Sequence, residues 1–141
     1  MADLIYNAFP EAMAKGVIGD CEAVDVFKRM LVTSSYTPDE DAHNHRADVT
    51  NEVTGTGYTA GGEVVACTVT RDDATNKTVL SFAAGSWSNS TITAAGEVVY
   101  INFGTAADDI LVYYNDFGGN VTTSGTTFSV AASTIPLAKS N

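Results

Sequence analysis

The second half of the chain is divided into short apolar or alternating runs, and each run ends in residues that favour turns. Runs of this kind predict β-strands. The segments between them are rich in Gly, Asp, Asn, Ser and Thr, which favour chain reversals. We therefore expect strands joined mostly by hairpins. The predicted strands are residues 64–70, 77–83, 97–103, 110–116 and 126–131.

Two of these runs also indicate how deeply their strands are buried. Residues 97–103, EVVYINF, are apolar nearly throughout, which predicts a central strand covered on both faces. In residues 127–130 the apolar Phe128 and Val130 alternate with Thr127 and Ser129. Since successive side chains in a strand point to opposite faces, this run predicts a half-buried strand.

The first half of the chain adds one helix and one strand to this set. Pro10 suits the first turn of a helix, Glu11 favours its positive end and Gly16 can end it, so we predict a helix over residues 10–15. Residues 24–32 predict a further strand. The polar stretch that follows allows one helical turn near residues 48–54, before a group of glycines.

The predicted fold is mainly β. A length of 141 residues corresponds to one ordinary domain, so we treat residues 1–141 as a single domain. At least six short strands and one helix point to two packed sheets or a barrel. The expected architecture is a jelly-roll-like β-sandwich with a short N-terminal helix.

Net charge and hydropathy restrict the partners. There are 17 acidic and 7 basic residues, a formal net charge of −10, which repels the phosphate backbone of nucleic acid. Direct nucleic-acid binding is therefore not expected. The sequence has no apolar run long enough to span a bilayer and no secretory leader pattern, so neither a membrane nor a secreted protein is expected. Cys21 and Cys67 do not form a CxxC pair, and we expect free, largely buried thiols.

The search for catalytic and metal-binding motifs finds little. No nucleophile elbow, phosphate-binding loop or HExxH motif is present, so no catalytic residue, enzymatic activity or cofactor is predicted. His43, His45 and Asp41 are weak candidates for metal ligands. We favour a solvated loop, because clustered carboxylates in loops are usually solvated. Asp72 and Asp73, between two predicted strands, are interpreted as part of a turn.

Three side chains are candidates for contacts with a partner: Arg29, Trp87 and Tyr114. Lys28 and Arg29 are adjacent in a predicted strand and point to opposite faces, so we expect one of them at a rim or an interface. Trp87 is the only tryptophan and can either anchor a partner or pack in the core. Tyr113 and Tyr114 also point to opposite faces, which predicts one buried ring and one available ring.

Several segments together resemble one family. They are MLVTSSYTPDEDAH at 30–43, NEVTGTGYTAGG at 51–62, TVTRDDATN at 68–76, SWS at 86–88, VVYINFG at 98–104 and DFGGNVTTSGTTFSV at 116–130. They occur in order over nearly the whole chain and resemble the capsid cement, or decoration, proteins of tailed phages. Arg29 departs from the pattern, which has an apolar residue there.

The resemblance implies a non-enzymatic virion protein with a jelly-roll fold. It implies a homodimer on the outer face of an icosahedral capsid that bridges neighbouring major capsid protein subunits and stabilises the shell. The protein would be made in the host cytoplasm. Such a dimer is multivalent, so modest contacts at each site add through high effective concentration.

Two other functions fit the sequence. A phage tail or tail-tube component has a similar composition, and fold alone does not fix function. A small carbohydrate-binding module would need an exposed aromatic platform around Trp87 and a tyrosine.

Overall fold

The computed structural model describes residues 3–23 and 26–138. These residues form a mainly β fold with one α-helix, one short 3₁₀ turn and ten strands. The helix α1 spans Ala8–Ala14 and the turn η1 spans Arg46–Asp48. The strands are β1 Leu4–Ile5, β2 Phe27–Val32, β3 Glu63–Val65, β4 Cys67–Asp72, β5 Lys77–Phe82, β6 Gly85–Ser90, β7 Thr93–Ile101, β8 Ile110–Thr122, β9 Thr126–Val130 and β10 Ser133–Ala138. The predicted mainly β class is confirmed.

The largest sheet, which we call the body sheet, has the strand order β1-β8-β7-β2-β3 and is antiparallel throughout. Strand β7 lies in its middle and is buried from Ala94 to Ile101. This confirms a central strand over the first five residues of EVVYINF, but the strand ends at Ile101, and Phe103 lies beyond it and is exposed. On β9, Phe128 and Val130 are buried while Thr127 and Ser129 are exposed, so the predicted half-buried strand is confirmed as well.

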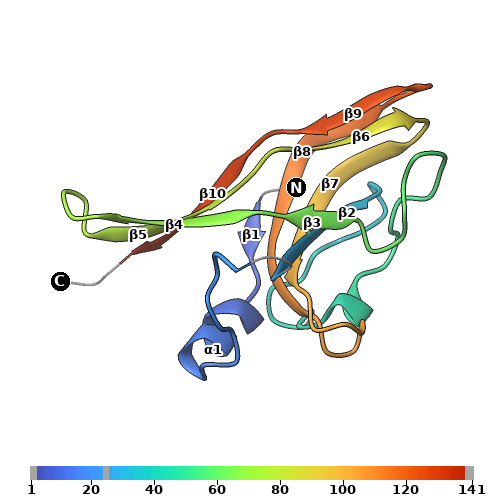
Figure 1. Ribbon diagram of the computed structural model, residues 1–141. Coiled ribbons are helices and arrows are strands. Elements are labelled where there is room, and N and C mark those ends of the chain that lie inside the picture. Colours follow the sequence, from blue (N-terminus) through green and yellow to red (C-terminus); the bar gives the residue numbers. More distant parts are fainter. Residues whose placement is uncertain (1–2, 24–25, 139–141) are drawn as a thin grey trace.

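The remaining strands form a long antiparallel ribbon. Strand β5 pairs with β10, and β6 pairs with β9. Two residues separate β5 from β6, and two separate β9 from β10. The two strand pairs therefore continue one another through bends at residues 83–84 and 131–132. The β6–β9 half stays with the body, while β5 and β10, joined by β4, project from it (Figure 1). We call β4, β5 and β10 the arm.

Both faces of the body sheet are covered. Leu31 of β2 lies in a cluster with Trp87 of β6 and Phe128 of β9, so one face packs against the ribbon. Met30 and Val32, on the other face of β2, pack with Tyr36 and a further set of buried side chains. The irregular segment after β2 supplies that cover: Val49 packs against this second cluster, and the guanidinium of Arg46 lies over the Tyr100 ring.

Helix α1 begins two residues before the predicted start. Phe9 and Ala12 are buried on one side of it, as an amphipathic helix requires. Gly16 follows with a φ of 68°, and its N–H donates to the carbonyl oxygen of Met13. This left-handed residue ends the helix where the sequence predicted.

Several predicted boundaries need correction. Strand β2 begins at Phe27; residues 24 and 25 of the prediction lie outside the described residues. The run at 64–70 divides into β3 and β4, which pair with different strands. The prediction of a helical turn near residues 48–54 is wrong, because the helical turn η1 lies earlier, at Arg46–Asp48. Glu52 instead bridges to Val32, and the Val53 N–H donates to Leu31, so this segment extends along the end of β2.

Candidate functional site

The arm carries the β4–β5 hairpin at its far end, away from the body sheet (Figure 1). One face of the arm is apolar: Val69 of β4 pairs with Leu80 of β5, which pairs with Ile135 of β10. Leu80 and Ile135 are buried in the cluster that contains Phe9 of α1. Contacts with the helix segment therefore cover much of this face.

The opposite face of the arm is richer in hydroxyl groups, although Val79 and Pro136 also belong to it. Thr68 pairs with Ser81 and Ser81 pairs with Thr134, so their side chains share one face. Thr68, Thr70 and Thr134 are exposed, and Ser81 is half-buried. This hydroxyl-rich face is open to contacts with a partner.

The tip of the arm is a turn built around Asp72. Its carboxylate accepts hydrogen bonds from the backbone N–H of Ala74 and Thr75 and from the Thr75 hydroxyl. These hydrogen bonds lower the pKa of Asp72, and the bond from the Thr75 hydroxyl has the largest effect. Asn76 completes the turn with a φ of 56°. The interpretation of Asp72 and Asp73 as a turn is confirmed.

The base of the arm is held by buried charges. Arg29 and Glu97 are both fully buried, and Arg29 Nε lies 3.1 Å from Glu97 Oε2. Arg29 Nη2 donates to the carbonyl oxygen of Ala83, at the bend between β5 and β6, over 2.6 Å. Glu97 Oε1 accepts from the hydroxyl of Tyr113 at 3.3 Å and from the amide of Asn115 at 3.1 Å. The pair thus joins body strands to the ribbon.

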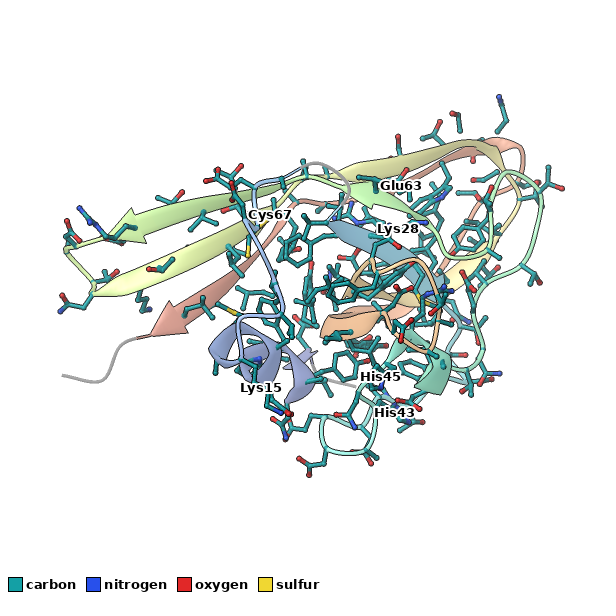
Figure 2. The ribbon with its side chains drawn as sticks, turned by 60° about the horizontal axis from the view of Figure 1, so that its bottom comes forward. Lys15, Lys28, His43, His45, Glu63 and Cys67 are labelled. Carbon is teal, nitrogen blue, oxygen red and sulfur yellow. The ribbon has the colours of Figure 1, made fainter. Side chains whose placement is uncertain are left out.

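A third charge, Glu63 of β3, completes what we call the charge cluster: Arg29, Glu97 and Glu63. A Cβ placed on Gly85 would overlap the Glu63 carboxylate and lie 2.5 Å from Arg29 Nη1, so both groups lie next to this glycine. Arg29 Nη1 has no hydrogen-bond partner within the described residues. The Ser86 N–H donates to the Glu63 carboxylate. Figure 2 labels Glu63 on the body sheet and Cys67 at the start of the arm.

Burial dominates the titration of both carboxyl groups in the charge cluster. It raises the pKa of Glu97 above the ordinary value of 4.5, and the positive charge of Arg29 only partly opposes the shift. Burial raises the pKa of Glu63 in the same way, with Arg29 and the Ser86 N–H opposing. The neutral forms of these groups are therefore favoured by folding.

These shifts predict how stability depends on pH. A carboxyl group whose pKa is raised by folding, such as Glu63 or Glu97, contributes its full stabilisation below pH 4.5. That contribution is lost as pH rises through the pKa of the folded state. The pKa of Asp48 is lowered below 3.8 by the N–H groups of His45 and Asn44, so its contribution is lost as pH falls below that value. We expect maximal stability on the mildly acidic side of neutrality, measured as the thermal midpoint across a pH series.

Replacing one carboxyl group tests this assignment. Glu63→Gln is expected to flatten the loss of stability as pH rises above 4.5, because an amide does not titrate. Glu22→Gln, at an exposed position, is the matched control and is expected to keep the wild-type slope. Equal slopes in wild type and Glu63→Gln would show that Glu63 does not titrate with folding.

The three interface candidates all lie inside the fold. Arg29 is 0%, Trp87 7% and Tyr114 3% exposed. Arg29 is therefore wrong as an interface candidate, and Lys28, which is half-buried, is the member of that pair that can lie at a rim. Trp87 packs against Phe128 and Tyr58, so it forms no exposed platform for a carbohydrate.

The two adjacent tyrosines do point to opposite faces of β8, because they belong to different clusters. The expectation that one ring stays available is wrong, since Tyr113 is also buried. The covering segments on both faces of the body sheet account for this.

The metal-ligand candidates have other partners. His43 Nδ1 lies 3.0 Å from the Tyr36 hydroxyl, and Asp41 Oδ1 accepts from the Asn7 amide at 2.5 Å. The backbone N–H of His45 donates to Asp48. Figure 2 shows both histidines on the side of the body away from Glu63 and Cys67. Within residues 3–23 and 26–138, no three His, Cys, Asp or Glu side chains form a group that could hold a metal ion.

Both cysteines are free thiols, as predicted. Cys67 is buried, and burial raises its pKa to about 12, which keeps it protonated. Cys21 is half-buried, so the prediction of burial holds fully only for Cys67. In the described part of the chain, no helix is long and apolar enough to cross a membrane.

Comparison with known proteins gives no match, whether against family models, curated proteins or solved structures.

Proposed function

We propose that this chain is a non-enzymatic phage capsid cement protein. It binds the outer surface of an icosahedral shell and holds adjacent major capsid protein subunits together. The observation that carries the proposal is the arm, a three-stranded sheet that projects from the body and carries an exposed hydroxyl-rich face. A projecting sheet of this kind can reach from one shell subunit to the next.

The base of the arm supports the same role. A cement protein must transmit load between its contacts, so a hinge at the base would weaken it. Arg29 ties β2 to the bend after β5, and Tyr113 hydrogen-bonds Ser133 at the start of β10. Both arm strands that return to the body are thereby fixed to it.

Charge and sheet packing add further support. The net charge of −10 suits a basic docking face on a shell protein. The ribbon packs over the body sheet, and we assign these layers to the jelly-roll sandwich that the sequence resemblance implies. In this proposal copies act as homodimers, so each dimer contacts the shell at two places.

The experiment is to add purified protein to capsid shells that lack it and to image them by cryo-electron microscopy. We expect ordered density outside the shell at twofold or quasi-twofold positions. We also expect decorated, DNA-filled particles to rupture at a higher temperature, because a ligand that binds only the assembled lattice stabilises it. Bare shells, or decoration without any gain in heat resistance, would refute the cement role.

A tail component is the second candidate. It is favoured by the outer edge of β4, which pairs with no strand of the described residues, because sheet edges can also join subunits into rings. The same images separate the two functions. Density confined to tails, or sixfold rings of the free protein, would support this second candidate.

A further inference from the structure

Strand β4 leaves one edge of the arm unpaired. It pairs with β5 and, within the described residues, with no strand on its other side. An open edge presents a row of backbone N–H and C=O groups that can pair with another strand. Natural proteins usually protect such edges with proline, charge or a cover. Strand β4 contains no proline, and its two charged residues, Arg71 and Asp72, lie at the end next to the turn. Thr68, Val69 and Thr70 are uncharged and exposed.

The other outer edge of the arm is different. Strand β10 contains Pro136, which has no N–H to donate. Proline is found in sheets mainly on edges, where it discourages pairing with a further strand. The arm therefore has one protected edge and one edge that is ready to pair.

Self-pairing of β4 is limited to a few registers. A twofold axis perpendicular to the sheet keeps each face on the same side, so residues opposite each other must share a face. The antiparallel pair must therefore be centred on a residue, and the candidates are Val69, Thr70 and Arg71. Centring on Arg71 places two positive charges opposite each other, which is unfavourable.

The two remaining registers differ in where Arg71 lies. Centring on Val69 places Arg71 opposite Cys67 of the other copy, which is 8% exposed and covered by its own fold. Centring on Thr70 places Arg71 opposite Val69, which is 37% exposed. The aliphatic stem of the arginine can lie over that valine, while its guanidinium keeps its ion pair with Asp73 at 3.0 Å.

We propose that two copies of this chain pair through β4, antiparallel and with Thr70 opposite Thr70, to form one continuous six-stranded sheet. Thr68 then faces Asp72 of the other copy, and opposed threonines are favourable cross-strand neighbours. This inference deepens the proposed function by identifying the surface where copies meet, and it rests on that function only for its use on a shell.

The pairing is expected to be weak in free solution. In this register five residues of each copy pair, residues 68–72, which is a short edge beside a standard interface of roughly 1,600 Å². Each copy carries a net charge of −10, so the copies repel each other. Self-association should therefore depend on protein concentration and strengthen when added salt screens the charges.

The first test is analytical ultracentrifugation of the full chain at low and high salt. We expect a monomer–dimer equilibrium that shifts toward dimer with salt. Thr70→Lys places two like charges opposite each other and is expected to weaken self-association about tenfold or more. Thr134→Lys, an exposed threonine of the same face but on β10, is the matched control and should behave like wild type.

The second test reads the register. Thr70→Cys is expected to give a covalent dimer with a short thiol crosslinker, far above the wild-type background from Cys21 and Cys67. Thr134→Cys should stay at that background, and Val69→Cys should crosslink less than Thr70→Cys. A monomer under all conditions, or a dimer that neither Thr70 variant affects, would overturn the inference. Neither test uses a shell, so a failure of shell binding leaves its result readable.

Discussion

Glu97→Leu is expected to lower the free energy of unfolding by about 3–5 kcal/mol. The reason is electrostatic: Arg29 remains fully buried, and its nearest counter-charge, 3.1 Å away, is gone. Glu63 offsets little of this, because it is only partly buried and shares its carboxylate with the Ser86 N–H. Urea denaturation at neutral pH, with the unfolding slope checked against wild type, measures the change.

The double variant Arg29→Met with Glu97→Leu separates charge from packing. Replacing both buried partners by apolar residues of similar size removes the uncompensated charge, so most of the lost stability should return. A double variant as unstable as Glu97→Leu would attribute the loss to packing around Tyr113 and Asn115 instead. Glu11→Ala, which breaks an exposed pair with Lys15 in the first turn of α1, is the control and should cost far less stability than Glu97→Leu.

The charge cluster also explains why an arginine can lie in the apolar strand β2. The sequence showed an arginine in one apolar run and a glutamate at the head of another. Opposite charges in two strands that are otherwise apolar indicate a buried ion pair. The sequence alone does not reveal how β2 and β7 are aligned. In the structure Arg29 lies opposite Val99 and reaches Glu97 only diagonally across the two strands. Glu97 and Glu63 could therefore not be predicted from the sequence as partners of Arg29.

The sequence predicted those structural elements that are determined by residues close together in the chain. The central strand β7, the alternation on β9, the end of α1 at Gly16 and the turn at Asp72 all follow from neighbours within a few positions. Apolar spacing and side-chain hydrogen bonds act over that range, so the sequence contains them directly.

The strands that were not predicted are those stabilised by pairing with strands far away in the sequence. Residues 85–90, GSWSNS, have the composition of a turn, yet they form β6 because β9 pairs with them. Strand β10 contains a proline and still pairs with β5 along six positions. Strand β1 has two residues and depends on Tyr113 and Tyr114 as partners. Long-range pairing of this kind has no local sequence signature, and the bent ribbon that forms the arm could not be predicted.

Gly62→Ala is expected to be comparably damaging, at about 3 kcal/mol or more, because two effects add at this position. The backbone φ is 77°, a left-handed conformation that costs an L-residue about 1–2 kcal/mol. A Cβ would also overlap the carbonyl oxygen of Arg29, and Met30 Cα would lie 2.8 Å from it, so backbone atoms of β2 would have to move. Gly104→Ala isolates the first effect, since φ there is 106° and no atom lies within 4 Å of the added Cβ. Urea denaturation of the two variants should give a clearly larger loss for Gly62→Ala. Equal losses would mean that conformation alone requires glycine at residue 62, and that β2 adjusts freely beside β3 and the base of the arm.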